Sequence, residues 1–139
     1  MTVLEEFWIV SNGISVYHQA ATEIIDETLF GGFISAILIF INELGNDEIK
    51  KLEMEGSKIY IMPCEKREWF FIGRSKKGKD KKIFRYLEEI REIFFEEYGE
   101  LIKSWDNNTE AFKELDKYIN INNEDSPAVK AQKQRSGFL

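Results

Sequence analysis

The sequence is poor in the residues from which many catalytic and metal sites are built. Its 139 residues include one cysteine, Cys64, and one histidine, His18. A single cysteine excludes a disulfide within the chain and fits a reducing compartment, and this pair cannot supply a structural zinc site. The two residues show no pairing motif for nucleophilic catalysis, so we expect His18 to be a strand residue with local partners. We therefore predict no enzyme, no metal and no cofactor.

Long hydrophobic runs are also missing. The longest, FISAILIFI, has nine residues, roughly half of what a helix needs to span a bilayer. No basic, apolar and small-residue pattern typical of a signal peptide opens the sequence. We expect a cytoplasmic protein that meets membranes only peripherally, if at all.

The sequence has fewer basic than acidic residues. The formal net charge of −6 at pH 7 argues against a nucleic-acid partner, because phosphate backbones are held mainly by Lys and Arg. The charge is uneven, with seven basic residues and one acidic residue between Arg74 and Arg85, and six Glu against one Arg from Glu88 to Glu100. We interpret the Glu-rich stretch as a solvated helix face rather than as paired catalytic carboxylates.

The residues that are present predict one α+β domain over residues 1–120. An apolar content of 43% suffices for one core. Five strands are expected: FWIV and ISVYHQ around an Asn-Gly hairpin, then residues 48–55, 57–62 and 69–74. Phe7–Val10 and Trp69–Ile72 are apolar at both odd and even positions, which predicts that both faces of each strand are covered. These two strands should therefore be central. Short turns between strands favour an antiparallel sheet.

Three helices complete the expected fold. The first covers about residues 27–44, the second begins near Asp80 and carries an apolar stripe, and the third covers about 109–119. The element order is β-β-α-β-β-β-α-α, which predicts a five-stranded antiparallel sheet with helices on both faces. Residues 121–139 are polar and contain Pro127, so we expect a disordered tail.

The segment GRSKKGKD, residues 73–80, matches seven of the eight positions of a phosphate-binding P-loop. The eighth position holds Asp80, where Ser or Thr would hold magnesium and where a carboxylate would repel phosphate. A P-loop also belongs to a β-α-β crossover, whereas this segment follows a three-strand meander. We interpret it as a solvated basic turn of Lys76, Lys77 and Lys79, with Asp80 capping the next helix. Contact of the lysines with acidic protein or anionic lipid is the alternative.

The first predicted helix carries more apolar surface than packing on one sheet face requires. Its apolar arc is roughly 200° wide, with Ile39 apart on the far side. Either a concave sheet or the C-terminal tail covers the excess, or a protein partner covers an outer flank formed by Ile34, Leu38 and Ile41. The strand over residues 48–55 would be able to pair with another copy if it forms a sheet edge.

With this element order the chain resembles the longin-like branch of the longin and roadblock domains, over about residues 4–120. The resemblance rests on FWIVSNGISVYHQ, on GGFISAILIFINELG, on the meander ending in WFFIGRS, and on a helical ending similar to that of archaeal members, FRYLEEIREIFFEEYGELIKSWDNNTEAFKELDKYI. It implies a profilin-like sheet with the first and fifth strands central. Members serve as dimerising platforms, among them small-GTPase regulators, vesicle-tethering subunits and the N-terminal domains of some membrane-fusion proteins.

Members of this family commonly dimerise through the first helix and the third strand, which correspond here to Ile34, Leu38, Ile41, Ile49 and Leu52. The resemblance implies a non-enzymatic module that forms a homo- or heterodimer and binds or regulates a small GTPase or a trafficking-type complex. Two other classes share this kind of sheet and remain open. One is a small-molecule sensor domain of PAS or GAF type, and the other is an actin-binding protein of the profilin type.

Overall fold

The structure is a computed structural model of the chain. It describes residues 3–11, 14–21, 51–53, 55–64, 69–76 and 78–129, together with the single positions 32, 34, 36 and 39. The elements are β1 (Glu6–Ser11), β2 (Ile14–Ala20), β3 (Lys51–Glu53), β4 (Lys58–Cys64), β5 (Trp69–Ser75), α2 (Asp80–Ile102) and η1 (Thr109–Lys117).

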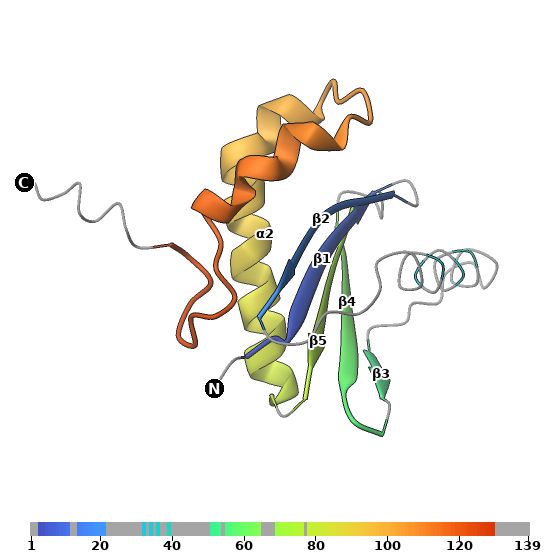
Figure 1. The fold of residues 1–139 in the computed structure, drawn as a ribbon, viewed down its shortest axis with the longest axis vertical. Helices are drawn as coiled ribbons and strands as arrows, with labels where there is room; N and C mark the ends of the chain where they lie inside the picture. Colours follow the sequence, from blue (N-terminus) through green and yellow to red (C-terminus); the bar gives the residue numbers. More distant parts are fainter. Residues whose placement is uncertain are drawn as a thin grey trace, which may run out of the picture.

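The five strands form one antiparallel sheet in the order β2-β1-β5-β4-β3 (Figure 1). The two strands that are apolar on both parities, β1 and β5, lie inside the sheet, as predicted. Every residue of β1 is buried, and so is every residue of β5 except Phe70. This burial follows from their position, because an inner strand has a neighbour on each side and packed side chains on each face.

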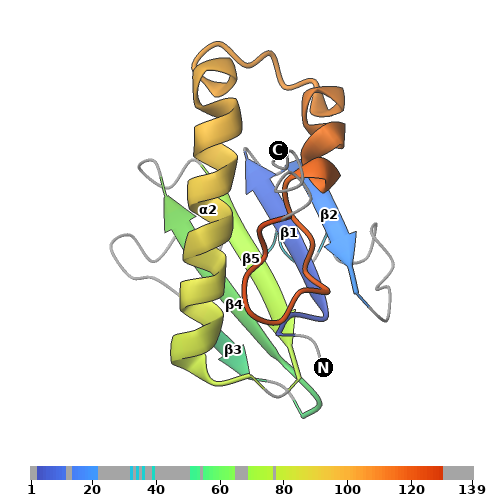
Figure 2. The same ribbon diagram turned by 90° about the vertical axis from the view of Figure 1, so that its left-hand side faces the viewer.

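One face of the sheet is covered by α2, η1 and the segment that follows them. Figure 2 shows α2 in front of β4 and β5, η1 in front of β2, and the segment after η1 in front of β1. The apolar stripe of α2 is fully buried at Ile83, Leu87, Ile90 and Phe94, which recur at intervals of four and three. With other side chains from the strands and η1, they form the larger of the two apolar clusters found among the described residues.

η1 differs from the expected third α-helix, because it is a 3-10 helix. It begins after Asn108, whose side chain accepts a hydrogen bond from the backbone N–H of Glu110 at 3.0 Å. Phe112 and Leu115, three positions apart, are both fully buried. A 3-10 helix places side chains three apart on one line, so this spacing suits its contact with the sheet.

The predicted disordered tail is wrong for residues 121–129, which pack against the domain. Ile121 is fully buried. The backbone N–H of Asn120 donates to Pro127, and that of Val129 donates to Tyr118, so the segment folds back on itself. The prediction of disorder rested on the polar composition of the segment. In the folded chain its polar groups form hydrogen bonds with other polar groups that only folding brings near. The packed domain therefore continues to Val129.

The opposite face of the sheet carries the second apolar cluster. It consists of buried residues, Trp8, Val10, Ile34, Ile59, Ile61 and Ile72, with Leu52 and Phe70 half-buried at its margin. Of the first predicted helix the structure describes positions 32, 34, 36 and 39, all helical, and the rest lies outside the described residues. Within the described part, no helix is both long and apolar enough to cross a membrane.

Candidate functional site

The strongest candidate for a functional site is the sheet edge formed by β3. This three-residue strand is one of the two edge strands of the described sheet, β2 being the other, and it pairs with β4 through the register Lys51–Tyr60, Leu52–Ile59 and Glu53–Lys58. An edge strand can take up a strand from another chain, since its second side is not paired within the described sheet. Successive side chains alternate between faces, so Leu52 is on the opposite face from Lys51 and Glu53.

Two of the five predicted partner-binding residues, Ile34 and Leu52, come together in the apolar cluster opposite α2. Ile34 is only 2% exposed, so it lies against the sheet and not on the predicted outer flank. The apolar arc of this helix is wide enough that the sequence pattern alone could not tell which flank meets the sheet. Leu38, Ile41 and Ile49 lie outside the described residues. Ile39, expected to lie apart, is 66% exposed.

The other face of the edge is tied to the start of α2 by Asp80. The ammonium of Lys51 donates to Oδ2 of Asp80 at 2.7 Å, and the hydroxyl of Tyr60 donates to Oδ1 at 2.7 Å. The hydrogen bond from Lys51, and then that from Tyr60, lowers the pKa of Asp80 below its ordinary value of 3.8. Burial, followed by the hydrogen bond to Asp80, raises the pKa of Tyr60 to about 12. These contacts fix β3 and β4 against α2.

Asp80 does not cap α2 in the predicted way. The N-cap residue is Lys79, and no side chain caps it by a hydrogen bond, because the Asp80 carboxylate faces Lys51 and Tyr60 instead. The prediction that Asp80 caps the helix is therefore wrong. The rejection of a P-loop agrees with the geometry, because a P-loop needs its first glycine in a loop, whereas Gly73 lies inside strand β5.

The basic turn before α2 is stabilised by an internal hydrogen bond and by close packing on α2. The backbone N–H of Gly78 donates to Oγ of Ser75 at 3.0 Å. A Cβ atom at Gly78 would lie 2.3 Å from Cδ1 of Ile83, so this glycine permits close packing of the turn on α2. Lys76 and Lys79 are exposed, whereas Lys77 lies outside the described residues.

The two sides of the edge differ in chemistry. Its apolar side joins a packed cluster, and its polar side chains are engaged with one another. No family model matches this sequence, and no curated protein matches it. Function is therefore inferred from the fold and from the geometry of the edge. Among the described residues no three metal-ligating side chains come together.

A buried charged network, which the sequence did not reveal, crosses three strands. Arg74 on β5 donates to Oε1 of Glu6 on β1 from Nη2 at 2.7 Å and from Nε at 3.0 Å. Nε2 of His18 on β2 lies 2.9 Å from Oε2 of Glu6. The imidazole also stacks on Trp8, with ring centroids 5.1 Å apart. Only the strand register, which pairs Glu6 with Arg74, brings residues so distant in sequence together.

Proposed function

We propose that this protein is a non-enzymatic interaction module with a longin-like, profilin-related fold, which dimerises through its first helix and the β3 edge. The observation that carries the proposal is the strand order β2-β1-β5-β4-β3, which makes β3 an edge strand. Leu52 of this edge packs against the same apolar cluster that contains Ile34 of the first helix. Backbone pairing at an edge, flanked by apolar side chains, is a common basis for recognition between chains.

In this proposal the dimer presents a surface to a small GTPase or a trafficking-type complex and responds to the nucleotide state of the GTPase through contact. The element order and the resemblance described above support this partner class. The exposed Lys76 and Lys79 would be peripheral to such a contact, because exposed surface charges contribute little. The sensor and actin-binding alternatives gain no specific support from the described residues.

The dimer is tested by size-exclusion chromatography coupled to light scattering. We expect the wild type to have the mass of two chains, and a variant carrying Ile39→Glu to have the mass of one folded chain, because Ile39 is the exposed described isoleucine of the first helix and a charge buried in a contact opposes association. Ile14→Glu is the matched control, since it makes the same substitution at an exposed isoleucine of β2, at the other edge of the sheet. A wild type that stays monomeric at tens of micromolar contradicts homodimerisation.

The GTPase is tested separately with purified small GTPases, each loaded with GDP or with a non-hydrolysable GTP analogue. We expect the wild-type dimer to bind at least one of them with a preference for one nucleotide state, measured by biolayer interferometry. Release of a fluorescent GDP analogue then shows whether binding promotes exchange. If no GTPase binds although the dimer forms, the regulatory role is withdrawn and the dimerising module remains.

A further inference from the structure

Two adjoining hollows lie along the seam between α2 and η1. One, of about 430 Å³, is bounded by the end of α2, the connecting loop and the start of η1. The other, of about 300 Å³, continues between the two helices as far as Tyr118. Both are lined by Glu110 and Ala111. The two hollows therefore adjoin at these residues, and together they are called the α2–η1 groove.

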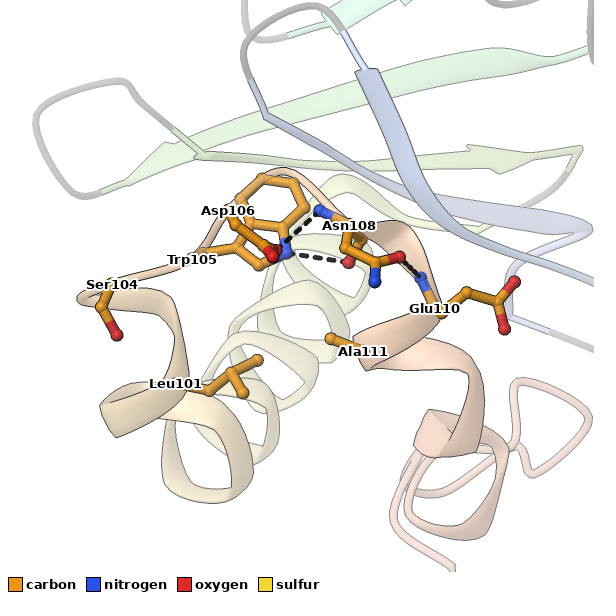
Figure 3. Close-up of a pocket in the computed structure, with 7 residues that line it drawn as sticks. All are labelled: Leu101, Ser104, Trp105, Asp106, Asn108, Glu110 and Ala111. Atoms are coloured by element: carbon orange, nitrogen blue, oxygen red, sulfur yellow. Dashed lines mark hydrogen bonds between the residues drawn. The ribbon is translucent and has the colours of Figure 1, made fainter.

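The walls of the α2–η1 groove include one exposed large apolar side chain, Leu101. Figure 3 shows Leu101 on α2, Ala111 on η1 and Trp105 in the connecting loop, and all three line the first hollow. Leu101 is 43% exposed, which is unusual for a large aliphatic residue in this domain. The indole N–H of Trp105 donates to the backbone carbonyl of Asn108 at 2.9 Å, which orients the ring. The groove therefore offers an apolar contact surface with a held aromatic ring.

The rim of the α2–η1 groove is negatively charged. It is lined by four carboxylates and one ammonium group, a net charge of −3 (Glu97, Asp106, Glu110, Glu114 and Lys113). Lys113 pairs with Glu110 at 3.1 Å, and both side chains are about 70% exposed. Such exposed pairs are weak and are easily exchanged for other partners. A groove with this rim, and with Leu101 exposed on its wall, is complementary to a basic segment that carries apolar residues.

A segment of that chemistry is present in this chain. Residues 130–139, KAQKQRSGFL, contain three basic residues and no acidic one, and include Phe138 and Leu139. The segment starts at one end of the groove, because the N–H of Val129 donates at 3.0 Å to the carbonyl of Tyr118. Ten extended residues reach roughly 33 Å. The stretch from Asn108 to Tyr118 needs only about 20 Å at the rise of a 3-10 helix.

We propose that the α2–η1 groove is a peptide-binding site and that its occupant is segment 130–139 of the same chain. The basic side chains of the segment face the rim carboxylates, and Phe138 packs near Leu101 and Trp105. A basic peptide from another protein would bind the same groove by displacing the segment. The inference is independent of the proposed dimer, since α2 and η1 cover the sheet face opposite to Ile34 and Leu52.

The test is nuclear magnetic resonance on the full chain, and the readout is a nuclear Overhauser effect between the ring of Phe138 and the methyl groups of Leu101. We expect it in the wild type and expect its loss when the segment is made acidic, by Lys130→Glu, Lys133→Glu and Arg135→Glu. Loss is also expected when the rim is made basic, by Glu97→Lys, Glu110→Lys and Glu114→Lys. Combining both sets restores the opposite charges, so the signal should return.

A matched control reverses three exposed basic residues near the start of α2, by Lys81→Glu, Lys82→Glu and Arg85→Glu. It changes the net charge by the same amount as the segment variant, and we expect it to keep the signal. Absence of the signal in a folded wild type overturns the proposal, and so does loss in the control equal to that in the segment variant. A signal that weakens on dilution identifies a segment from a second copy and overturns the same-chain assignment. High salt should weaken the signal in the wild type, because the rim charges are exposed.

Discussion

The carboxylate of Glu6 is fully buried between Arg74, whose side chain is 6% exposed, and His18, whose side chain is 12% exposed. Breaking a buried ion pair by removing one charge leaves the other uncompensated in a poorly solvated place. We expect Glu6→Gln to lower the free energy of unfolding by about 3 kcal/mol, measured by urea denaturation. Gln keeps the size of Glu but replaces one carboxylate oxygen by a donor N–H2 group, so the loss reports the charge together with one acceptor.

The matched control for Glu6→Gln replaces both partners at once, by Glu6→Leu with Arg74→Met. Exchange of a whole buried pair for apolar residues of similar volume is often neutral or stabilising. The double variant should therefore lose less stability than Glu6→Gln alone. If it loses as much or more, the network stabilises the sheet through packing and not through charge.

The lowered pKa of Asp80 predicts that the free energy of unfolding depends on pH. Its pKa is lowered in the folded state by the hydrogen bonds from Lys51 and Tyr60. The stabilisation is therefore complete above the unfolded-state pKa and is lost as the pH falls through the lower folded-state value. We expect Asp80→Asn to be less stable than the wild type near neutral pH, and the two to converge in acid, as measured by urea denaturation across a pH series. Asp125→Asn, at an exposed position, is the control, and a gap that persists unchanged in acid contradicts this origin.

At the scale of elements, the segment from Tyr118 to Val129 behaves as part of the core. The side-chain carbonyl of Gln19 accepts from the N–H of Ile121 at 2.7 Å, and Tyr86 donates to the carbonyl of Asn123. Because Ile121 is fully buried, we expect Ile121→Ala to cost about 3 kcal/mol of unfolding free energy. Asn122→Ala, at the exposed neighbouring position, should cost far less in the same urea denaturation series. If Ile121→Ala loses no more unfolding free energy than Asn122→Ala, the burial of Ile121 does not stabilise the fold.

Elements with a strong local signal were predictable from the sequence. The strands β1 and β5 are apolar on both parities, and α2 has an apolar stripe over its whole length, so their positions follow from periodicity. The segment 121–129 has no such pattern, since its order depends on Gln19 and Tyr86, which are distant in sequence. The network of Glu6 and Arg74 was hidden for the same reason, because it exists only in one strand register. Side-chain chemistry across strands is set by pairing and not by local pattern.

For the whole molecule, the two faces of the sheet have different roles in these proposals. The face covered by α2 and η1 is closed by aromatic packing around Phe94 and Phe112, and its outer surface carries the α2–η1 groove. The opposite face carries the smaller cluster and adjoins the β3 edge. A partner at the edge and a peptide in the groove would therefore bind on opposite sides of one sheet, and neither would exclude the other.

Dimerisation would make the stability of the whole molecule depend on its concentration. Association stabilises the folded state by mass action, and each tenfold rise in concentration adds about 1.4 kcal/mol per mole of dimer. We expect the Tm of the wild type to rise with protein concentration, and that of the Ile39→Glu variant to stay constant, as measured by differential scanning calorimetry. Ile14→Glu should retain the wild-type dependence. A wild-type Tm that does not change with concentration would mean that the chain folds and remains as a monomer, with the β3 edge left to a different partner.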